Sequence, residues 1–381
     1  MNWFLIAVAL VGHGFLWVAI VNRLHACPVV RWLLEALTRL SLLLFLCLPV
    51  VIAWIGFQQP SSLFQPFTSE ATWATYYCWL CIWVCVLSLF AKVFEERNRY
   101  DSKVVVESTS QLHDLSESLS EEPYLTDFAK RLARVPGNQT MQLHVENRRL
   151  KLPALPAELE GTRIVHLSDI HMAGRLERRY YEQLVEVVNE QQPDVIFVTG
   201  DIVEKTECWP WLETTLAPMR ARLGRYFILG NHDLFIDEAE TIKRLQELGW
   251  TYVGDQWEQT SWEGVPVSIG GNELHWKGPP AEPQPKRPAE FRLALSHTPD
   301  QLRWCIEAEA DLALAGHTHG GQFCAPILGP ILSPSLYGTK YCCGVFLGGG
   351  TVLHVTRGFS GKTPLRLNCP PEVAVLTLTD G

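Results

Sequence analysis

The chain has 381 residues, of which 47% are hydrophobic and 19% are charged, and its formal net charge is −9. This acidic balance argues against nonspecific nucleic-acid binding, which needs a cationic surface, and the many aliphatic and aromatic side chains exclude a disordered chain. The low charged fraction comes from the N-terminal region, because only six Lys, Arg, Asp or Glu side chains lie in the first 93 residues. The rest of the chain has an ordinary charged fraction and is long enough to bury a sizeable core.

Three uncharged, mostly apolar stretches in this first region are long enough to cross a membrane as helices: 3–22, 40–57 and 71–91. A hydrocarbon core of ~30 Å needs about 20 residues of helix. A cleaved signal peptide is the alternative for the first stretch, but no basic residue precedes it and two more stretches follow. We therefore expect residues 1–93 to form a transmembrane region with three helices.

The basic residues predict how these helices are oriented. The loop after the first span carries Arg23, Arg31 and Arg39, the loop 58–69 carries no Lys or Arg, and basic residues return after the third span. Lys and Arg concentrate on the cytoplasmic side of membrane proteins. We expect a multi-pass protein of the inner (cytoplasmic) membrane, with its N-terminus outside and its C-terminal domain in the cytoplasm. Eleven cysteines that mostly lack zinc-ligand spacing are compatible with a reduced domain there.

Residues 94–137 are expected to form a linker, because the stretch 107–123 is polar and acidic. The spacing of Leu125, Phe128 and Leu132 then places an apolar stripe on a short helix that also carries basic residues. Such a helix suits either the inner leaflet of the membrane or a packing site on the domain that follows.

Between residues 138 and 381, five apolar runs each end in a polar cluster: IVHLSDIH (164–171), VIFVTGD (195–201), YFILGNHD (226–233), LALSH (293–297) and LALAGHTHGG (312–321). Such runs are typical of strands buried on both faces. A helix-like segment at 180–192 lies between the first two, which is the β-α-β pattern of a layered α/β domain. Sites in such domains gather at the carboxyl ends of the strands. Gly200 and Gly230 are expected to let the chain turn sharply at two of these ends.

The clusters supply candidate metal ligands: Asp169, His171, Asp201, Asn231, His297, His317 and His319. Oxygen and imidazole donors without thiolate suit Mn, Fe, Zn or Ni. The set is too large for one ion with an open position, but divided between two ions it makes a centre that can clamp a phosphoryl group. Any one of these residues could be structural, as a helix cap, a turn residue or a core histidine. Their ordered series favours the metal site.

The motifs DIH, GD, GNHD, SH and GHTH, in this order, resemble those of the calcineurin-like metallophosphoesterase superfamily, and the resemblance covers roughly 160–381. The ending TRGFSGKTPLRLNCPPEVAVLTL (356–378) is similar to the bacterial membrane-associated branch, which includes YkuE-type phosphoesterases and a chlamydial UDP-diacylglucosamine pyrophosphatase. The resemblance implies an α/β fold, a four-layer α/β/β/α sandwich with its site at the strand ends, here preceded by the three transmembrane helices.

The resemblance also implies a role for each residue. Asp169, His171 and His319 would hold one metal ion; Asn231, His297 and His317 would hold the second; and Asp201 would bridge the two. His232 would face the phosphate and protonate or stabilise the leaving oxygen, with Asp233 orienting it, while a hydroxide between the metals attacks phosphorus. Two divalent ions are thus expected, with manganese the first choice and zinc, iron or nickel the alternatives.

Two features narrow the class of substrate: the differences from the superfamily's motifs, and the predicted membrane region. Protein phosphatases carry Asp-Arg-Gly after the GD motif, where this chain has GDIVEKT, so the phosphate-binding arginine is absent. The Pro-rich loop 279–288 is either a solvent loop or an edge of the substrate groove. A site at the inner leaflet favours lipid-linked phosphates, because tethering raises their local concentration.

We therefore expect a metal-dependent phosphodiesterase or pyrophosphatase that acts on a lipid or nucleotide-lipid. A UDP-diacylglucosamine-like molecule is the most specific candidate, membrane lipids are the expected partners, and no nucleic acid is expected. The alternatives are a membrane scaffold or sensor on an inactive fold, which would lack metal ligands, and an extracytoplasmic hydrolase of cell-wall phosphates.

Overall fold

The computed structural model describes residues 3–27, 29–58, 63–69 and 71–381. Of the expected loop 58–69, residues 59–62 lie outside the described residues. The chain divides into two compact units. The helical unit contains the residues up to Arg97 together with Ile327–Lys340, and the sheet unit contains Asn98–Pro326 together with Tyr341–Gly381.

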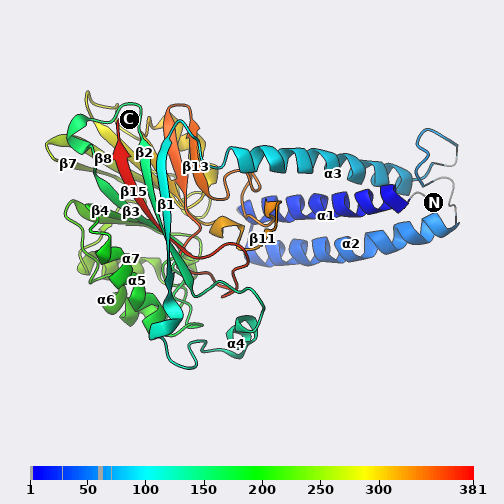
Figure 1. Ribbon diagram of the computed structural model, residues 1–381, viewed down its shortest axis with the longest axis horizontal. Helices are drawn as coiled ribbons and strands as arrows, with labels where there is room; N and C mark the ends of the chain where they lie inside the picture. Colours follow the sequence, from blue (N-terminus) through cyan, green and yellow to red (C-terminus); the bar gives the residue numbers. More distant parts are fainter. Residues whose placement is uncertain (1–2, 28, 59–62, 70) are drawn as a thin grey trace. The chain divides into compact units, whose positions relative to one another are not determined.

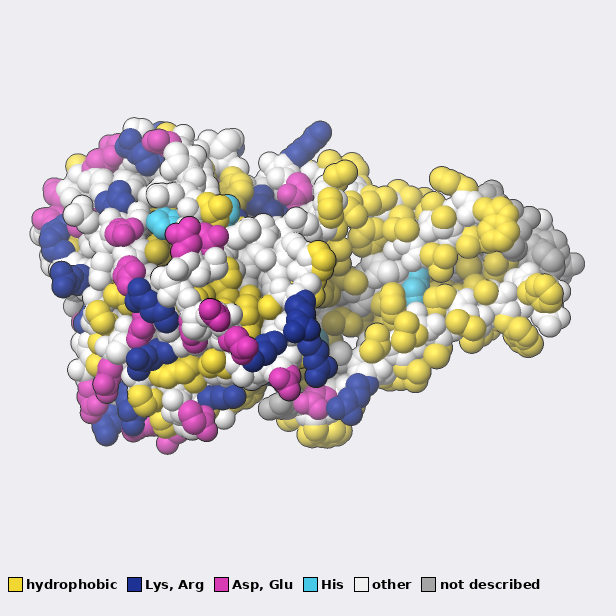
Figure 2. Space-filling view, turned by 60° about the horizontal axis from the view of Figure 1, so that its bottom comes forward, with side chains coloured by type: hydrophobic (Ala, Val, Ile, Leu, Met, Phe, Trp, Pro, Cys, Tyr) yellow, Lys and Arg dark blue, Asp and Glu magenta, His cyan; other side chains and the backbone are white. Residues whose placement is uncertain are grey.

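Three long helices make up most of the helical unit: α1 (Trp3–Ala26), α2 (Arg31–Gln58) and α3 (Trp73–Arg97) (Figure 1). Each is long and apolar enough to cross a membrane, which confirms three apolar helices where the sequence predicts them. The surface of these helices in Figure 2 is largely hydrophobic. The helix α2 begins nine residues before the predicted stretch 40–57, because Leu, Ala, Glu and Arg in that interval are good helix formers.

Small and polar residues bring the three helices together. A Cβ atom at Gly12 of α1 would lie 1.7 Å from the carbonyl oxygen of Cys81 in α3, so the glycine permits close approach of the two backbones. The His13 ring is buried, with Nδ1 2.7 Å from Tyr77 Oη and Nε2 2.9 Å from the carbonyl oxygen of Phe45 in α2. His13 therefore satisfies its polar atoms by joining all three helices.

Two sheets form the sheet unit (Figure 1). The seven-stranded sheet has the order β1 (Val105–Asp114), β2 (Gln142–Lys151), β15 (Glu372–Thr379), β3 (Arg163–Leu167), β4 (Val195–Thr199), β5 (Gly224–Ile228), β6 (Thr251–Tyr252). The six-stranded sheet has the order β13 (Gly344–Gly348), β14 (Thr351–Val355), β10 (Leu312–Ala315), β9 (Phe291–Ser296), β8 (Val265–Asn272), β7 (Trp257–Trp262). The α-helices of this unit are α4 (Asp127–Ala133), α5 (Arg178–Glu190), α6 (Leu212–Thr215), α7 (Glu238–Glu247) and α8 (Leu302–Glu307). Two further short strands are β11 (Cys324–Ala325) in the sheet unit and β12 (Gly329–Pro330) in the helical unit.

Alternating side chains on the strands create the layers. Ile164 of β3 belongs to the apolar core between the two sheets, together with Leu293 of β9. Its neighbour Val165 points to the other face, into the core that contains Leu184 of α5. The outer face of the second sheet packs against Leu302 of α8. This arrangement confirms the expected α/β/β/α sandwich.

The expected linker 94–137 requires a correction, because most of it belongs to the sheet unit. Strand β1 pairs antiparallel with β2 along its length. Its sequence is polar because β1 is an edge strand whose side chains are all partly or fully exposed, so neither face needs apolar residues. The expected short helix is present as α4, with Thr126 as its N-cap. Phe128 of α4 stays half-exposed, with the Arg175 guanidinium 5.2 Å from its ring centre.

Candidate metal centre

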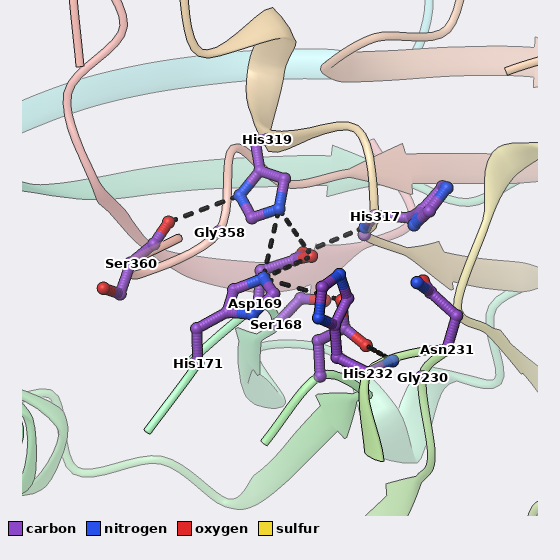
Figure 3. Close-up of polar contacts among 12 residues, drawn as sticks. Ser168, Asp169, His171, Gly230, Asn231, His232, His317, His319, Gly358 and Ser360 are labelled. Carbon is purple, nitrogen blue, oxygen red and sulfur yellow. Dashed lines mark hydrogen bonds and ion pairs between the residues drawn. The ribbon is translucent and has the colours of Figure 1, made fainter. Parts of the chain in front are cut away.

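The polar clusters follow five strands at their carboxyl ends. Asp169 and His171 follow β3, Asp201 follows β4, Asn231, His232 and Asp233 follow β5, His297 follows β9, and His317 and His319 follow β10. The strands β3, β4 and β5 run parallel in the first sheet, and β9 and β10 run parallel in the second. Because both sets of carboxyl ends meet at one edge of the sandwich, the structure brings all seven predicted ligands together. Figure 3 shows Asp169, His171, Asn231, His317 and His319 of this set.

The first group of candidate ligands is Asp169, His171 and His319. The two histidines point their Nε2 atoms at each other across 3.1 Å, and His319 Nε2 lies 3.4 Å from Asp169 Oδ1. These three residues form one of the side-chain groups with the spacing to hold a metal ion. Their donor atoms converge on one point, as metal coordination requires.

The second group is Asp201, His297 and His317, with Asn231 beside it. Asp201 Oδ2 lies 3.4 Å from His297 Nε2, and Asn231 Oδ1 lies 3.2 Å from the same nitrogen. Asp201 Oδ2 is also 3.5 Å from His171 Nε2 of the first group. Asp201 therefore lies between the two groups, where a bridging ligand would have to be.

Orphaned polar atoms show that these residues fit two cations. Asp169 Oδ1, Asp201 Oδ2 and His317 Nε2 are buried and have no hydrogen-bond partner among the described residues. Buried polar atoms in native proteins almost always have a partner. All three atoms belong to predicted ligands, so a cation in each group would supply the missing interactions.

The protonation states of two histidines also suit metal binding. Burial lowers the pKa of His319 to about 3, and burial together with the nearby charge of His297 lowers the pKa of His317 well below its usual value. Both imidazoles are therefore neutral near pH 7 and keep a lone pair for a metal ion.

The expected role of Asp233 in orienting His232 is corrected by the structure. The Asp233 carboxylate is fully buried and accepts hydrogen bonds from the backbone N–H groups of Ile202 and Val203, both at 2.9 Å, and of Gly230 at 2.8 Å. These bonds satisfy the amides of the two turns after β4 and β5. Asp233 thus supports the backbone of the site, and a different carboxylate lies beside His232.

That carboxylate is Glu204, which the sequence reasoning missed. Its Oε1 atom lies 2.5 Å from Nδ1 of His171 and 3.1 Å from Nδ1 of His232. Burial raises the pKa of Glu204, but the two histidines outweigh burial and lower the pKa below its usual value, so the side chain is ionised. The available signal was its place in GDIVEKT, three residues after Asp201.

A C-terminal segment also supports the first group. The backbone N–H of Ser360 donates to the carbonyl oxygen of Asp169 at 2.9 Å, and a Cβ at Gly358 would lie 2.7 Å from that of Asp169. The buried Arg366 guanidinium donates to the carbonyl oxygens of His319 at 3.1 Å and Arg357 at 2.8 Å. Arg366 therefore holds this segment against the loop that carries His319.

An aromatic side chain lies against the second group. The ring centre of Trp276 is 4.7 Å from that of His317 and 5.5 Å from that of His297. The loop 279–288, by contrast, is bonded to the second sheet. The Trp257 indole donates to the carbonyl oxygen of Ala281 at 3.0 Å, and Lys286 pairs with Asp311 at 2.7 Å. Contact between this loop and a substrate stays a prediction.

These features are those of a candidate metal centre, and comparison with known proteins identifies the family. The sequence matches the calcineurin-like phosphoesterase family over residues 162–321. It is 30% identical to the uncharacterized metallophosphoesterase YkuE of Bacillus subtilis, with 60% of this chain and 83% of the relative covered. It is 28% identical to the phosphodiesterase YaeI of Escherichia coli, with 57% of this chain and 82% of the relative covered.

The similarity to a third relative also covers the helical unit. The chain is 26% identical to a transmembrane protein with metallophosphoesterase domain from Danio rerio, with 98% of this chain and 88% of the relative covered. The protein therefore belongs to the calcineurin-like phosphoesterase family, as the motifs predict, and is a phosphoric ester hydrolase. Its three apolar helices and this relative indicate a membrane protein.

Proposed function

We propose that the protein is a membrane-anchored phosphodiesterase or pyrophosphatase that uses two divalent metal ions, with manganese the expected metal, to hydrolyse a lipid-linked phosphate. The observation that carries the proposal is the pair of ligand groups that meet at Asp201, with an orphaned atom in each group. When bound, two such cations neutralise charge on the phosphoryl group and lower the pKa of the attacking water.

The side chains around this centre have separate tasks in the reaction. The backbone N–H of His232 donates to Asp201 Oδ1 at 2.8 Å, which turns the other carboxylate oxygen, Oδ2, toward both ligand groups. Glu204 lies beside Nδ1 of His232, so Nε2 is the nitrogen that the ring presents away from Glu204. His232 is only partly buried and can deliver a proton from Nε2 to the leaving oxygen.

The substrate class is inferred from the membrane helices and from the missing phosphatase arginine. A site tethered to a membrane meets lipid-linked phosphates at a raised local concentration. A phosphodiester or pyrophosphate on a lipid or nucleotide-lipid fits this setting, and a UDP-diacylglucosamine-like molecule is the most specific candidate. The inactive scaffold alternative is disfavoured, because all seven ligand side chains are present and close together.

A lipid hydrolysis screen tests this function. Full-length protein in detergent micelles is incubated with a bacterial lipid extract and Mn²⁺, and the phosphorylated species are followed by mass spectrometry, with His232→Ala as the control. Loss of particular lipid phosphates with the wild type alone supports the proposal. No change in any lipid, together with efficient cleavage of bis(4-nitrophenyl) phosphate, would overturn the substrate assignment while leaving the enzyme class intact.

We also propose that the sheet unit is cytoplasmic in the inner membrane, on the evidence of the basic residues that flank the spans. Single cysteines introduced at the exposed positions Gln65, between α2 and α3, and Ser118, in the sheet unit, test this orientation. A membrane-impermeant maleimide applied to whole cells should label Gln65→Cys and spare Ser118→Cys. The reverse pattern would favour the extracytoplasmic alternative.

A further inference from the structure

A segment between two parts of the sheet unit belongs to the helical unit. Ile327–Lys340 lies between β11 and β13 in the sequence, yet it forms a compact unit with the long helices. Its sequence ILGPILSPSLYGTK is mostly apolar and carries one cation. Several of its large side chains are exposed: Ile327, Leu332, Leu336 and Tyr337.

Two polar side chains of the helices hold this segment. The buried Asn22 amide of α1 donates to the carbonyl oxygen of Ile331 and accepts from the N–H of Ser333, both at 3.0 Å. Lys92 of α3 donates to the carbonyl oxygen of Pro330 at 2.6 Å and also bonds Thr339. The segment is therefore fixed against the ends of α1 and α3.

The positions of these anchors give their depth in a membrane. The uncharged stretches of the first and third spans end at Asn22 and Ala91, and the next residues are Arg23 and Lys92. The first charges after a span mark the level at which lipid headgroups begin. With α1 and α3 spanning a membrane, the segment would lie at the headgroup level, where an exposed tyrosine such as Tyr337 is also favoured.

A small cavity lies between the segment and the two helices. Its volume is about 170 Å³, below the ~300–1,000 Å³ of typical ligand pockets, so it suits one end of a molecule. Its walls from α1 include the apolar side chains of Phe15, Val18 and Ala19, followed by Asn22 and Arg23. The cavity therefore changes from apolar to polar along α1, as a phospholipid does from chain to headgroup.

Charge in this cavity favours an anion. The exposed Arg23 directs one Nη to the carbonyl oxygen of Ala19 at 3.1 Å, which leaves further N–H groups of its five to serve a ligand. A Cβ at Gly338 would lie 3.9 Å from the Arg23 guanidinium, so the segment passes directly beside this cation. The carboxylate of Glu95 also lines the cavity, but it is paired with Lys92 at 3.2 Å and accepts from Thr339 at 2.8 Å.

We propose that this cavity binds a phospholipid, with the phosphate on Arg23 and an acyl chain along Phe15 and Val18. Arginine is suited to this task because its planar guanidinium can bond two phosphate oxygens at once. The proposal depends on the membrane location of α1 and α3 and is independent of the substrate of the metal centre.

Native mass spectrometry of the full-length protein in detergent, titrated with phosphatidylglycerol, tests the site. Arg23→Gln should weaken the tightest lipid-binding step about tenfold, the usual value of a charge-assisted hydrogen bond. Ala19→Trp, which fills the cavity, should abolish the step. Arg39→Gln is the matched control, because Arg39 is an exposed cation on α2 that pairs with Glu35 at 3.4 Å and does not line the cavity.

Diacylglycerol with the same acyl chains separates the headgroup from the chains. It should bind the wild type at least about tenfold more weakly than phosphatidylglycerol, since it lacks the phosphate. Unchanged affinity in both Arg23→Gln and Ala19→Trp, an equal loss in Arg39→Gln, or equal binding of the two lipids would overturn the proposal. Because no turnover is measured, failure of this site would be distinct from failure of the proposed enzyme function.

Discussion

Gly230→Ala is a sharp test of how the second ligand group is built. A Cβ at Gly230 would lie 2.2 Å from Asp201 Oδ1, 2.5 Å from the Asp201 backbone nitrogen and 2.6 Å from His297 Cε1. Ordinary contacts of a Cβ begin at 3.4 Å, so Asp201 or the turn itself must move by roughly 1 Å. A shift of this size at a catalytic group typically costs about 10²-fold in rate.

The substitution should spare the fold while it damages the site. Overpacking costs about 1–3 kcal/mol, which is less than the ~5–15 kcal/mol by which domains are stable. We expect kcat/KM for bis(4-nitrophenyl) phosphate to fall at least about 10²-fold. The bound metal per chain, measured by plasma mass spectrometry after dialysis, should fall as well. Circular dichroism checks that the variant is folded.

Gly278→Ala is the matched control, because no described residue beyond its two chain neighbours has an atom within 4 Å of its Cβ position, and its backbone is not in the left-handed region. Its activity and metal content should equal those of the wild type. A folded Gly230→Ala variant with activity within about threefold of the wild type would refute the reasoning, since the crowding around Asp201 would then carry no catalytic cost.

Three further predictions follow from the site and its surroundings. Glu204→Ala should lower kcat by about 10²-fold or more, because His232 loses the carboxylate beside Nδ1; steady-state kinetics measures this, and a KM effect alone would contradict it. Glu372→Gln should cost about 3–5 kcal/mol of stability, because it breaks a buried pair with Arg148 at 2.7 Å. Burial raises the pKa of Glu372, but Arg357 and Arg148 outweigh burial and lower the pKa below its usual value of 4.5. The ionised Glu372 therefore stabilises the folded protein at pH values above 4.5, and this stabilisation is lost progressively as the pH falls below 4.5. Thermal unfolding should therefore show a smaller difference between wild type and Glu372→Gln at pH 4 than at pH 7, and an equal difference would contradict the assignment. Treatment with EDTA should abolish hydrolysis, and Mn²⁺ should restore it; full activity in the chelator would exclude a metal-dependent reaction.

The sequence predicted the strands that carry the site because those strands are buried and parallel. Runs such as 195–198 are continuously apolar, and the polar residues that follow must lie at the carboxyl end of the strand. Edge strands give no such pattern. The polar sequence of β1 resembles a linker, since its order comes from backbone pairing with β2 and not from a buried face.

Within the site, the candidate metal ligands could be predicted from the sequence, but the residues that hold those ligands in place could not. Gly230 was expected to permit a sharp turn, yet its backbone is outside the left-handed region and the glycine is needed because Asp201 and His297 leave no room for a side chain. Gly200, in contrast, has φ +92°, as a turn of that kind requires. Glu204 and Arg366 depend on contacts across long stretches of the chain, which spacing alone does not reveal.

The rate of phosphodiester hydrolysis by Asp201→Ala, with Mn²⁺ at saturation, tests the central claim most directly. Asp201 Oδ2 lies within 3.5 Å of imidazole nitrogens in both ligand groups, so its loss should disable both. We predict a fall of at least about 10²-fold relative to the wild type, in a variant that remains folded. Turnover equal to that of the wild type would contradict a reaction at a centre of two metal ions.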